Sequence, residues 1–167
     1  MIVSNATPLI YLSRIRKLGL LKELFKLVII PYEVYQEVVV RGKKEGFQDA
    51  LFIEKAIEEG WIKVKEAKTD NKLIKIAKEL DKGEIEVISL AENLKPELTL
   101  IDDASARIIA ESFGLNVKGT LYVILKAFKQ KLITKQEILV LLNQLAREGF
   151  RLSQELYLQI LSEMEEK

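Results

Sequence analysis

The stretch IVSNATPLI, residues 2–10, runs from a short apolar strand directly into a helix. Thr7 followed by Pro8 is typical of a helix N-cap and first helical position, so the strand should end close to Asn5. In an open parallel sheet, ligands bind beyond the carboxyl ends of the strands. The sequence therefore puts an amide, rather than a carboxylate, at a strand tip where a metal-dependent enzyme would need negative charge.

The alternation of strand and helix patterns continues along the chain. The apolar runs LVII, WIKVKEA, LTLI and LNVKG are each followed by a helical pattern. This order predicts a three-layer α/β/α fold with a central parallel sheet of about five strands. Pro31 should open a helix after LVII, while Gly60 and Gly114 stand where helices should stop.

The chain of 167 residues, 49% hydrophobic and 31% charged, suits one domain spanning 1–167. From about residue 120 onward only helical patterns remain, which predicts a helical C-terminal extension. No apolar run approaches the roughly 20 residues that span a bilayer, and no signal-peptide pattern opens the chain. We therefore expect a cytoplasmic protein without a membrane partner.

The composition restricts the chemistry. Cysteine and histidine are both absent, which excludes disulfides, thiolate nucleophiles and the commonest acid-base and zinc ligand. Any metal must be bound through oxygen, which favours Mg²⁺ or Mn²⁺. With 26 basic and 25 acidic residues the net charge is +1, so affinity for nucleic acid would have to come from local patches.

Polar residues should gather at one edge of the predicted sheet. Asn5 ends the first strand, Asp102 and Asp103 follow LTLI, Glu84 begins the helix GEIEVISLA, and Glu37 lies in the helix after LVII. Carboxylates that converge repel one another unless a cation lies between them, and the basic residues do not obviously neutralise this group. A bound metal would also activate water for hydrolysis of a phosphodiester.

Each of these residues also has a purely structural explanation. Asp103 is placed as the N-cap of the following helix, and Asp102 could add to that cap. Glu84 would lie in a helix first turn, where the dipole favours negative charge, and Glu37 could be solvated or ion-paired. Asn5 could be a turn residue whose side chain bonds its own backbone.

Five segments, in this order and spacing, resemble a PIN domain: IVSNATPLI, IPYEVYQEVV, LDKGEIEVISLA, LIDDASARIIAESFG and VKGTLYVILKA. The PIN fold is that of the metal-dependent nuclease toxins of VapBC toxin-antitoxin pairs. The resemblance covers nearly the whole chain and is greatest to stand-alone prokaryotic PIN-like proteins without assigned function. It implies a Mg²⁺- or Mn²⁺-dependent ribonuclease, with RNA as substrate and with an antitoxin protein and a second copy of the chain as partners.

The resemblance also implies a quartet of site residues, which falls by position on Asn5, Glu37, Glu84 and Asp103. Glu37, Glu84 and Asp103 would be the catalytic carboxylates, and Asp102 a supporting metal ligand. The departure is Asn5, because the matching position normally carries Asp. An amide oxygen can ligate Mg²⁺ but adds no charge, so the alternative is a weakened or inactive module that binds RNA or protein.

RNA contacts are expected from Thr120, which matches a polar residue of the family and could instead be a helix N-cap, and from two basic groups. These groups, which could equally be solvated faces, are Arg14, Arg16 and Lys17, and Arg41, Lys43 and Lys44. A phospho-acceptor receiver-type domain also carries acids at parallel strand ends, but WIKVKEA offers no mid-sheet phospho-acceptor Asp.

Overall fold

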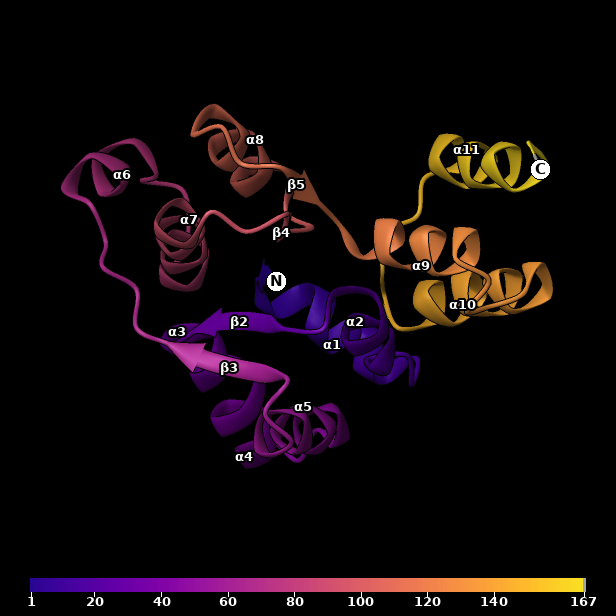
Figure 1. Ribbon diagram of the computed structural model, residues 1–167, viewed down its shortest axis with the longest axis horizontal. Coiled ribbons are helices and arrows are strands. Elements are labelled where there is room, and N and C mark those ends of the chain that lie inside the picture. The colour runs from indigo at the N-terminus through magenta and orange to yellow at the C-terminus, as the bar shows by residue number, and fades with distance from the viewer. Residues whose placement is uncertain (167) are drawn as a thin grey trace. The chain divides into compact units, whose positions relative to one another are not determined.

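A computed structural model describes residues 1–166 and contains a five-stranded, all-parallel sheet (Figure 1). Its strands, in chain order, are β1 (Ile2–Ser4), β2 (Val28–Pro31), β3 (Ile62–Lys65), β4 (Thr99–Leu100) and β5 (Val117–Lys118). Their order across the sheet is β3-β2-β1-β4-β5. The predicted α/β/α fold is therefore confirmed.

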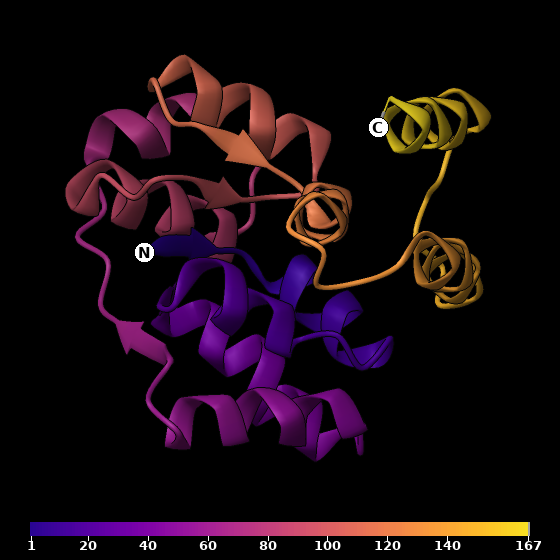
Figure 2. The same cartoon turned by 45° about the vertical axis from the view of Figure 1, so that its right-hand side comes forward.

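Helices cover both faces of this sheet. The first group is α1 (Ala6–Arg14), α2 (Gly19–Phe25), α3 (Tyr32–Tyr35), the π-helix η1 (Gln36–Arg41), α4 (Gly42–Lys44) and α5 (Gln48–Glu58). The second group is α6 (Asn71–Ile76), α7 (Lys82–Leu94) and α8 (Ala104–Ser112). Because crossovers between parallel strands are right-handed, the helices between β1 and β3 lie on one face of the sheet. The helices that follow β3, where the chain crosses back toward β4 and β5, lie on the other face. Figures 1 and 2 show this division.

The strands are apolar on both sides because both faces are covered. All residues of β1, β2 and β4 are buried, and the register pairs Val3 with Ile29 on one side and Ser4 with Leu100 on the other. Strand β3 lies at the edge and is more exposed, with two of its four positions being lysines. Continuous apolar runs in the middle and charge at the edge are what this topology requires.

The helix boundaries differ in part from those expected. Helix α1 begins at Ala6 with Asn5 as its N-cap, so the prediction of Thr7 as N-cap was wrong. Pro8 is accommodated because first-turn N–H groups need no partner within the helix. Pro31 is the N-cap of α3, as its position suggested. Gly60 and Gly114, at φ +84° and +77°, follow the ends of α5 and α8 and use the left-handed conformation that suits glycine.

The chain divides into two compact units, residues 1–120 and 121–167. The second unit is helical, as predicted, and contains most of α9 (Thr120–Lys129) together with α10 (Lys135–Arg147) and α11 (Gln154–Glu165). A capping box at Thr134 starts α10, and Ser153 caps α11. Lys129 Nζ pairs with Glu163 Oε2 at 3.0 Å and so joins α9 to α11. The expectation of a single domain stays a prediction.

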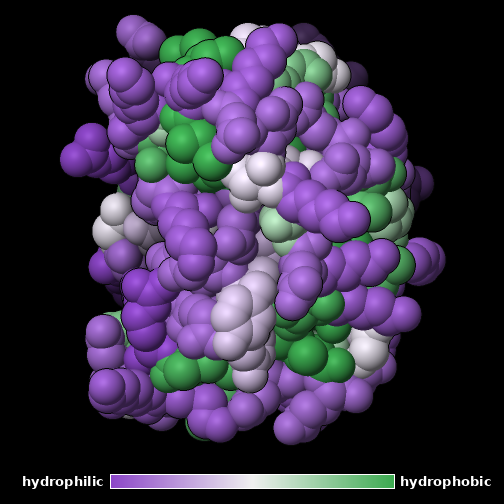
Figure 3. Space-filling model, turned by 90° about the vertical axis from the view of Figure 1, so that its left-hand side faces the viewer, coloured by the Kyte–Doolittle hydropathy of each residue, from purple (hydrophilic) through white to green (hydrophobic). Residues whose placement is uncertain are grey.

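No helix within residues 1–166 is both long and apolar enough to cross a membrane. Figure 3 shows one face of the molecule, on which hydrophilic side chains predominate and hydrophobic ones form small separate groups.

Candidate functional site

The order of the strands identifies where a site should lie. From β1 the chain adds β2 and then β3 on one side of β1. It then crosses back and adds β4 and β5 on the other side, so the strand order reverses between β1 and β4. The crevice beyond the carboxyl ends at such a point is where open α/β sheets bind ligands. Asn5 follows β1 directly, and its N–H donates to the Leu100 carbonyl at 2.9 Å. Asp102 and Asp103 follow β4, so three of the predicted site residues meet at this edge.

Asn5 is a buried amide with no hydrogen-bond partner for its side chain among residues 1–166. Only 7% of the residue is exposed, and its side chain does not cap α1 although it occupies the N-cap position. The alternative in which the amide bonds its own backbone is therefore wrong. Among the described residues the fully buried side-chain oxygens without a partner are those of Ser13 and Thr99, so the Asn5 amide keeps some contact with solvent. Its oxygen is therefore available to a ligand.

Glu37 lies at the start of η1, where the helix is wound as a π-helix rather than an α-helix. Such segments are rare and occur frequently at functional sites. Burial raises the pKa of the Glu37 carboxyl, and repulsion from Asp81 raises it further, while Arg41 partly opposes these effects. Glu37 is therefore a half-buried carboxylate within reach of other acids.

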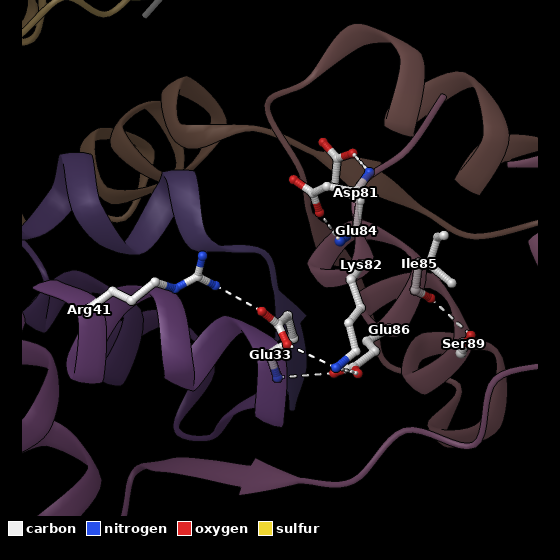
Figure 4. A network of polar contacts seen from close by, with 8 residues as sticks. All are labelled: Glu33, Arg41, Asp81, Lys82, Glu84, Ile85, Glu86 and Ser89. Atoms are coloured by element: carbon white, nitrogen blue, oxygen red, sulfur yellow. Dashed lines mark hydrogen bonds and ion pairs between the residues drawn. The ribbon is translucent and has the colours of Figure 1, made fainter. Parts of the chain in front are cut away.

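Glu84 closes a capping box at the start of α7. Glu84 Oε2 accepts from the Asp81 N–H at 3.0 Å, and Asp81 Oδ1 accepts from the Glu84 N–H at 2.8 Å (Figure 4). Burial is the largest cause that raises the pKa of Glu84, and repulsion from Asp81, Asp103 and Glu37 adds to it. The structural interpretation of Glu84 as a cap is confirmed, and its role in the site stays a prediction.

Asp103 is the N-cap of α8, as its position suggested. Its Oδ1 accepts from the Ala106 N–H at 2.9 Å. It is also close enough to Glu84 to raise the pKa of that residue. The carboxylates of Glu37, Glu84 and Asp103, which come from η1, α7 and the end of β4, are therefore coupled electrostatically at one edge of the sheet.

The donor set fits a hard divalent cation in its chemistry, although its side chains are not gathered around one. The candidate donors are all oxygens, and the amide of Asn5 is without a partner. In the described part of the chain, however, no group of three or more acidic side chains is arranged to hold a metal ion. Glu84 and Asp103 each use one oxygen in a helix cap, so a cation at this edge would draw on their second oxygens or displace the caps.

Asp102 has a different role from the one suggested by its place in the sequence. It does not add to the cap of α8, so that alternative was wrong. Instead its Oδ1 accepts from the Thr120 N–H at 2.8 Å and its Oδ2 accepts from the Thr120 hydroxyl at 2.6 Å. Burial raises the pKa of Asp102, and the two bonds from Thr120 lower it. This pair connects the end of β4 to the start of α9, so Thr120 contacts a candidate site residue, while its contact with RNA stays a prediction.

Basic residues do neutralise part of the acidic region, contrary to the expectation from sequence. Glu33 Oε1 accepts from Arg41 Nη2 at 2.8 Å, and Glu33 Oε2 accepts from Lys82 Nζ at 3.0 Å. Glu86 Oε2 accepts from the Glu33 N–H at 3.0 Å (Figure 4). This network joins α3 and η1 to α7, the elements that carry Glu37 and Glu84. It also separates the roles of Glu84 and Glu86, since Glu86 belongs to the network.

Asp81 and Glu33 are residues near the site that the sequence interpretation missed. The order Asp81-x-x-Glu84 is a capping-box pattern and could have identified Asp81. Nothing local distinguishes Glu33, because its partners Arg41 and Lys82 lie 8 and 49 positions away.

Three of the six basic residues predicted to contact RNA are paired with acids. Arg14 Nε lies 3.4 Å from Asp49 Oδ1, Arg41 pairs with Glu33, and Lys43 Nζ lies 2.8 Å from Glu54 Oε1. Arg16, Lys17 and Lys44 complete the predicted set. Their role with RNA stays a prediction.

A parallel sheet with the order β3-β2-β1-β4-β5 and acidic side chains near the switch point defines an open α/β domain with a ligand-binding edge. A PIN domain family model matches residues 1–166. A solved PilT N-terminus domain protein from the hyperthermophilic archaeon Sulfolobus solfataricus P2 is similar in fold, with a TM-score of 0.51 and 17% identity. The likeness covers 77% of this chain and 94% of that one. No curated protein matches the sequence.

The chain belongs to the PIN domain family, a nuclease-like family. PIN domains are generally metal-dependent, and the family in general has RNA or antitoxin partners.

Gly119 provides a test of the contact between Asp102 and Thr120. A Cβ at Gly119 would stand 2.6 Å from Asp102 Oδ1 and 3.3 Å from Arg107 Nη1. The Asp102 carboxylate is held by two hydrogen bonds and cannot yield without breaking them. Gly119→Ala should therefore lower the free energy of unfolding, measured in urea, by about 1–3 kcal/mol. Gly19→Ala, where a Cβ meets nothing within 4 Å, is the control and should not lower it.

The raised pKa of Glu37 predicts a pH-dependent stability. The folded protein holds this proton more tightly than the unfolded chain, whose pKa is near the ordinary 4.5. Stability is therefore highest below 4.5, falls as the pH rises through the folded pKa, and remains lower above it. Glu37→Gln should raise the urea midpoint at about pH 7 but not at about pH 4. The exposed Glu45→Gln is the control, and an equal effect of Glu37→Gln at both pH values would contradict the assignment.

Proposed function

We propose that the protein is a metal-dependent ribonuclease of PIN type that hydrolyses RNA phosphodiesters with Mg²⁺ or Mn²⁺. The observation that carries this proposal is the electrostatic coupling of Glu37, Glu84 and Asp103 at the switch point of the sheet. Glu37 and Glu84 are half-buried and Asp103 is exposed, and carboxylates that repel one another at a ligand-binding edge cost stability that a bound cation would offset.

The residues that would hold the cation are the carboxylates of Glu37, Glu84 and Asp103 and the amide oxygen of Asn5. A bound Mg²⁺ or Mn²⁺ supplies a Lewis acid that polarises the phosphodiester and lowers the pKa of a water molecule. Asp102, our predicted supporting ligand, has both oxygens bonded to Thr120, so in this arrangement it positions the end of β4 next to Asp103. Glu33 and Asp81 position the helices that present Glu37 and Glu84.

Asn5 favours a second candidate, a PIN-fold module that binds RNA or protein without cutting. The amide contributes no charge against the cost of desolvating a divalent ion, so metal affinity is lower than with a carboxylate at this position. A toxin role with an antitoxin partner, a homodimer and a cytoplasmic location remain proposals that rest on the family. A small open reading frame beside the gene would support the toxin role.

Asp103→Asn separates the cap from the chemistry, because asparagine caps helices as well as aspartate does but carries no charge. We expect the wild-type protein to cleave single-stranded RNA in Mn²⁺ and EDTA to stop it. Asp103→Asn should lower the rate by a factor of about a hundred or more while it leaves the unfolding midpoint nearly unchanged.

The control is Asp70→Asn, which makes the same change at the N-cap of α6. It should not affect cleavage. Full activity of Asp103→Asn, with contaminating nuclease excluded, would remove Asp103 from the mechanism.

Asn5→Asp should restore the missing negative charge. We expect Mn²⁺ to bind about tenfold more tightly in calorimetry, because a carboxylate replaces an amide among the ligands. In EDTA the same variant should be less stable than the wild type, since another acid joins a group that already repels. Asn143→Asp, at an exposed position of α10, is the control for charge and should not change the Mn²⁺ affinity. Unchanged Mn²⁺ affinity in Asn5→Asp would show that position 5 is not a ligand.

A further inference from the structure

A second concave site lies at the opposite end of the sheet from the carboxylates. It is a cavity of about 390 Å³ formed by the end of α1, the start of α2, the last turns of α5 and the residue before β3. That residue is Trp61, whose carbonyl accepts from the Val28 N–H at 2.9 Å and so marks the amino end of β2. The cavity lies entirely within residues 1–120 and has the size of a small-molecule pocket.

The walls of the cavity combine aromatic surface with a carboxylate. Trp61 and Phe52 supply the aromatic surface, and Phe52 is 45% exposed. Glu59 Oε2 accepts from Trp61 Nε1 at 3.0 Å, which fixes the carboxylate against the indole. Lys22 Nζ at 3.8 Å and Lys55 Nζ at 4.0 Å balance the charge of Glu59.

Arg16 supplies a positive charge that nothing in the described chain balances. Arg16 is an exposed residue in the lining of the cavity, and its side chain has no hydrogen bond or ion pair with another of residues 1–166. Arg16 also has a φ of +58°, a conformation that glycine would adopt at lower cost. Lys26, Lys95 and Lys131 share this feature, so the backbone alone does not distinguish Arg16. What distinguishes Arg16 from these lysines is that it lines a cavity.

Ser13 lies behind the wall of the same cavity, with a hydroxyl that is buried away from solvent. The residue is 1% exposed, and its hydroxyl has no hydrogen-bond partner among the described residues. Native proteins rarely leave a buried hydroxyl unpaired. An aromatic wall, a fixed carboxylate and a guanidinium without a partner among the described residues together form the lining of a polar ligand site.

We propose that this cavity binds a nucleotide, with the base against Phe52 and Trp61 and the phosphate on Arg16. Each part of a nucleotide has a counterpart, since Glu59 can accept from base or ribose donors and guanidinium binds phosphate in bidentate fashion. The nucleotide is either free or one unit of an RNA strand.

The proposal does not depend on the proposed nuclease activity, because the two sites share no residue and lie at opposite ends of the strands. Binding can be measured in EDTA, where no metal-dependent cleavage takes place. Asp103→Asn should bind nucleotide as the wild type does, so failure at one site is distinguishable from failure at the other.

Trp61 makes the measurement direct, because it is the only tryptophan in the chain. In EDTA, uridine monophosphate or adenosine monophosphate should change its fluorescence saturably. Uridine, which lacks the phosphate, should bind about tenfold more weakly or worse. A single-stranded RNA pentamer tests whether the bound nucleotide is instead one unit of an RNA strand. Saturation by the monophosphates indicates a free nucleotide, and saturation by the pentamer alone indicates a strand.

Arg16→Gly is the decisive variant, because it removes the guanidinium and places at this positive φ the residue type that adopts it at the lowest cost. It should unfold at the same temperature as the wild type or higher, yet lose nucleotide binding by about tenfold or more. Lys95→Gly makes the same backbone change at the end of α7 and should bind nucleotide normally. Three results would each overturn the proposal: no saturable change with any nucleotide probe, equal nucleotide binding in Arg16→Gly, or binding of uridine as tight as that of uridine monophosphate.

Discussion

The reversal of strand order between β1 and β4 is the constraint on which the rest of the structure depends. Because every strand is parallel, every strand ends at the same edge, and the reversal opens that edge between the first and fourth strands. Asn5 and Asp103 are nearly 100 positions apart in the sequence, yet they follow the two strands that flank the opening. Helices η1 and α7 then bring Glu37 and Glu84 within electrostatic reach of the same edge.

The carboxylates at this edge work against folding and are stabilised by local devices. Burial and mutual repulsion raise the pKa of Glu37 and Glu84, so each is destabilising in its charged form. The capping box of Asp81, the cap of Asp103 and the pairing of Glu33 with Arg41 and Lys82 provide compensating contacts. An arrangement that opposes folding and is held by its surroundings is typical of a functional site.

The sequence interpretation was most successful where the evidence was local. Strand and helix alternation predicted the α/β/α fold, and position within that alternation predicted that Asp103 would cap a helix. It failed where the partner was distant. Asp102 bonds Thr120 rather than the adjacent helix, and Arg41 and Lys82 neutralise Glu33 across two helices. The cavity beside Trp61 had no signal in the sequence, because its walls come from four separate elements.

The sequence by itself determined the class of fold, the oxygen-only chemistry of any metal site, and the amide at the tip of β1. These follow from composition and from periodicities that span only a few residues. Only the tertiary structure decided that the Asn5 amide is buried without a partner, that Asp102 is already bonded, and that Arg16 lines a cavity. Burial and partnership are properties of neighbours in space, and packing selects those neighbours after the local elements have formed.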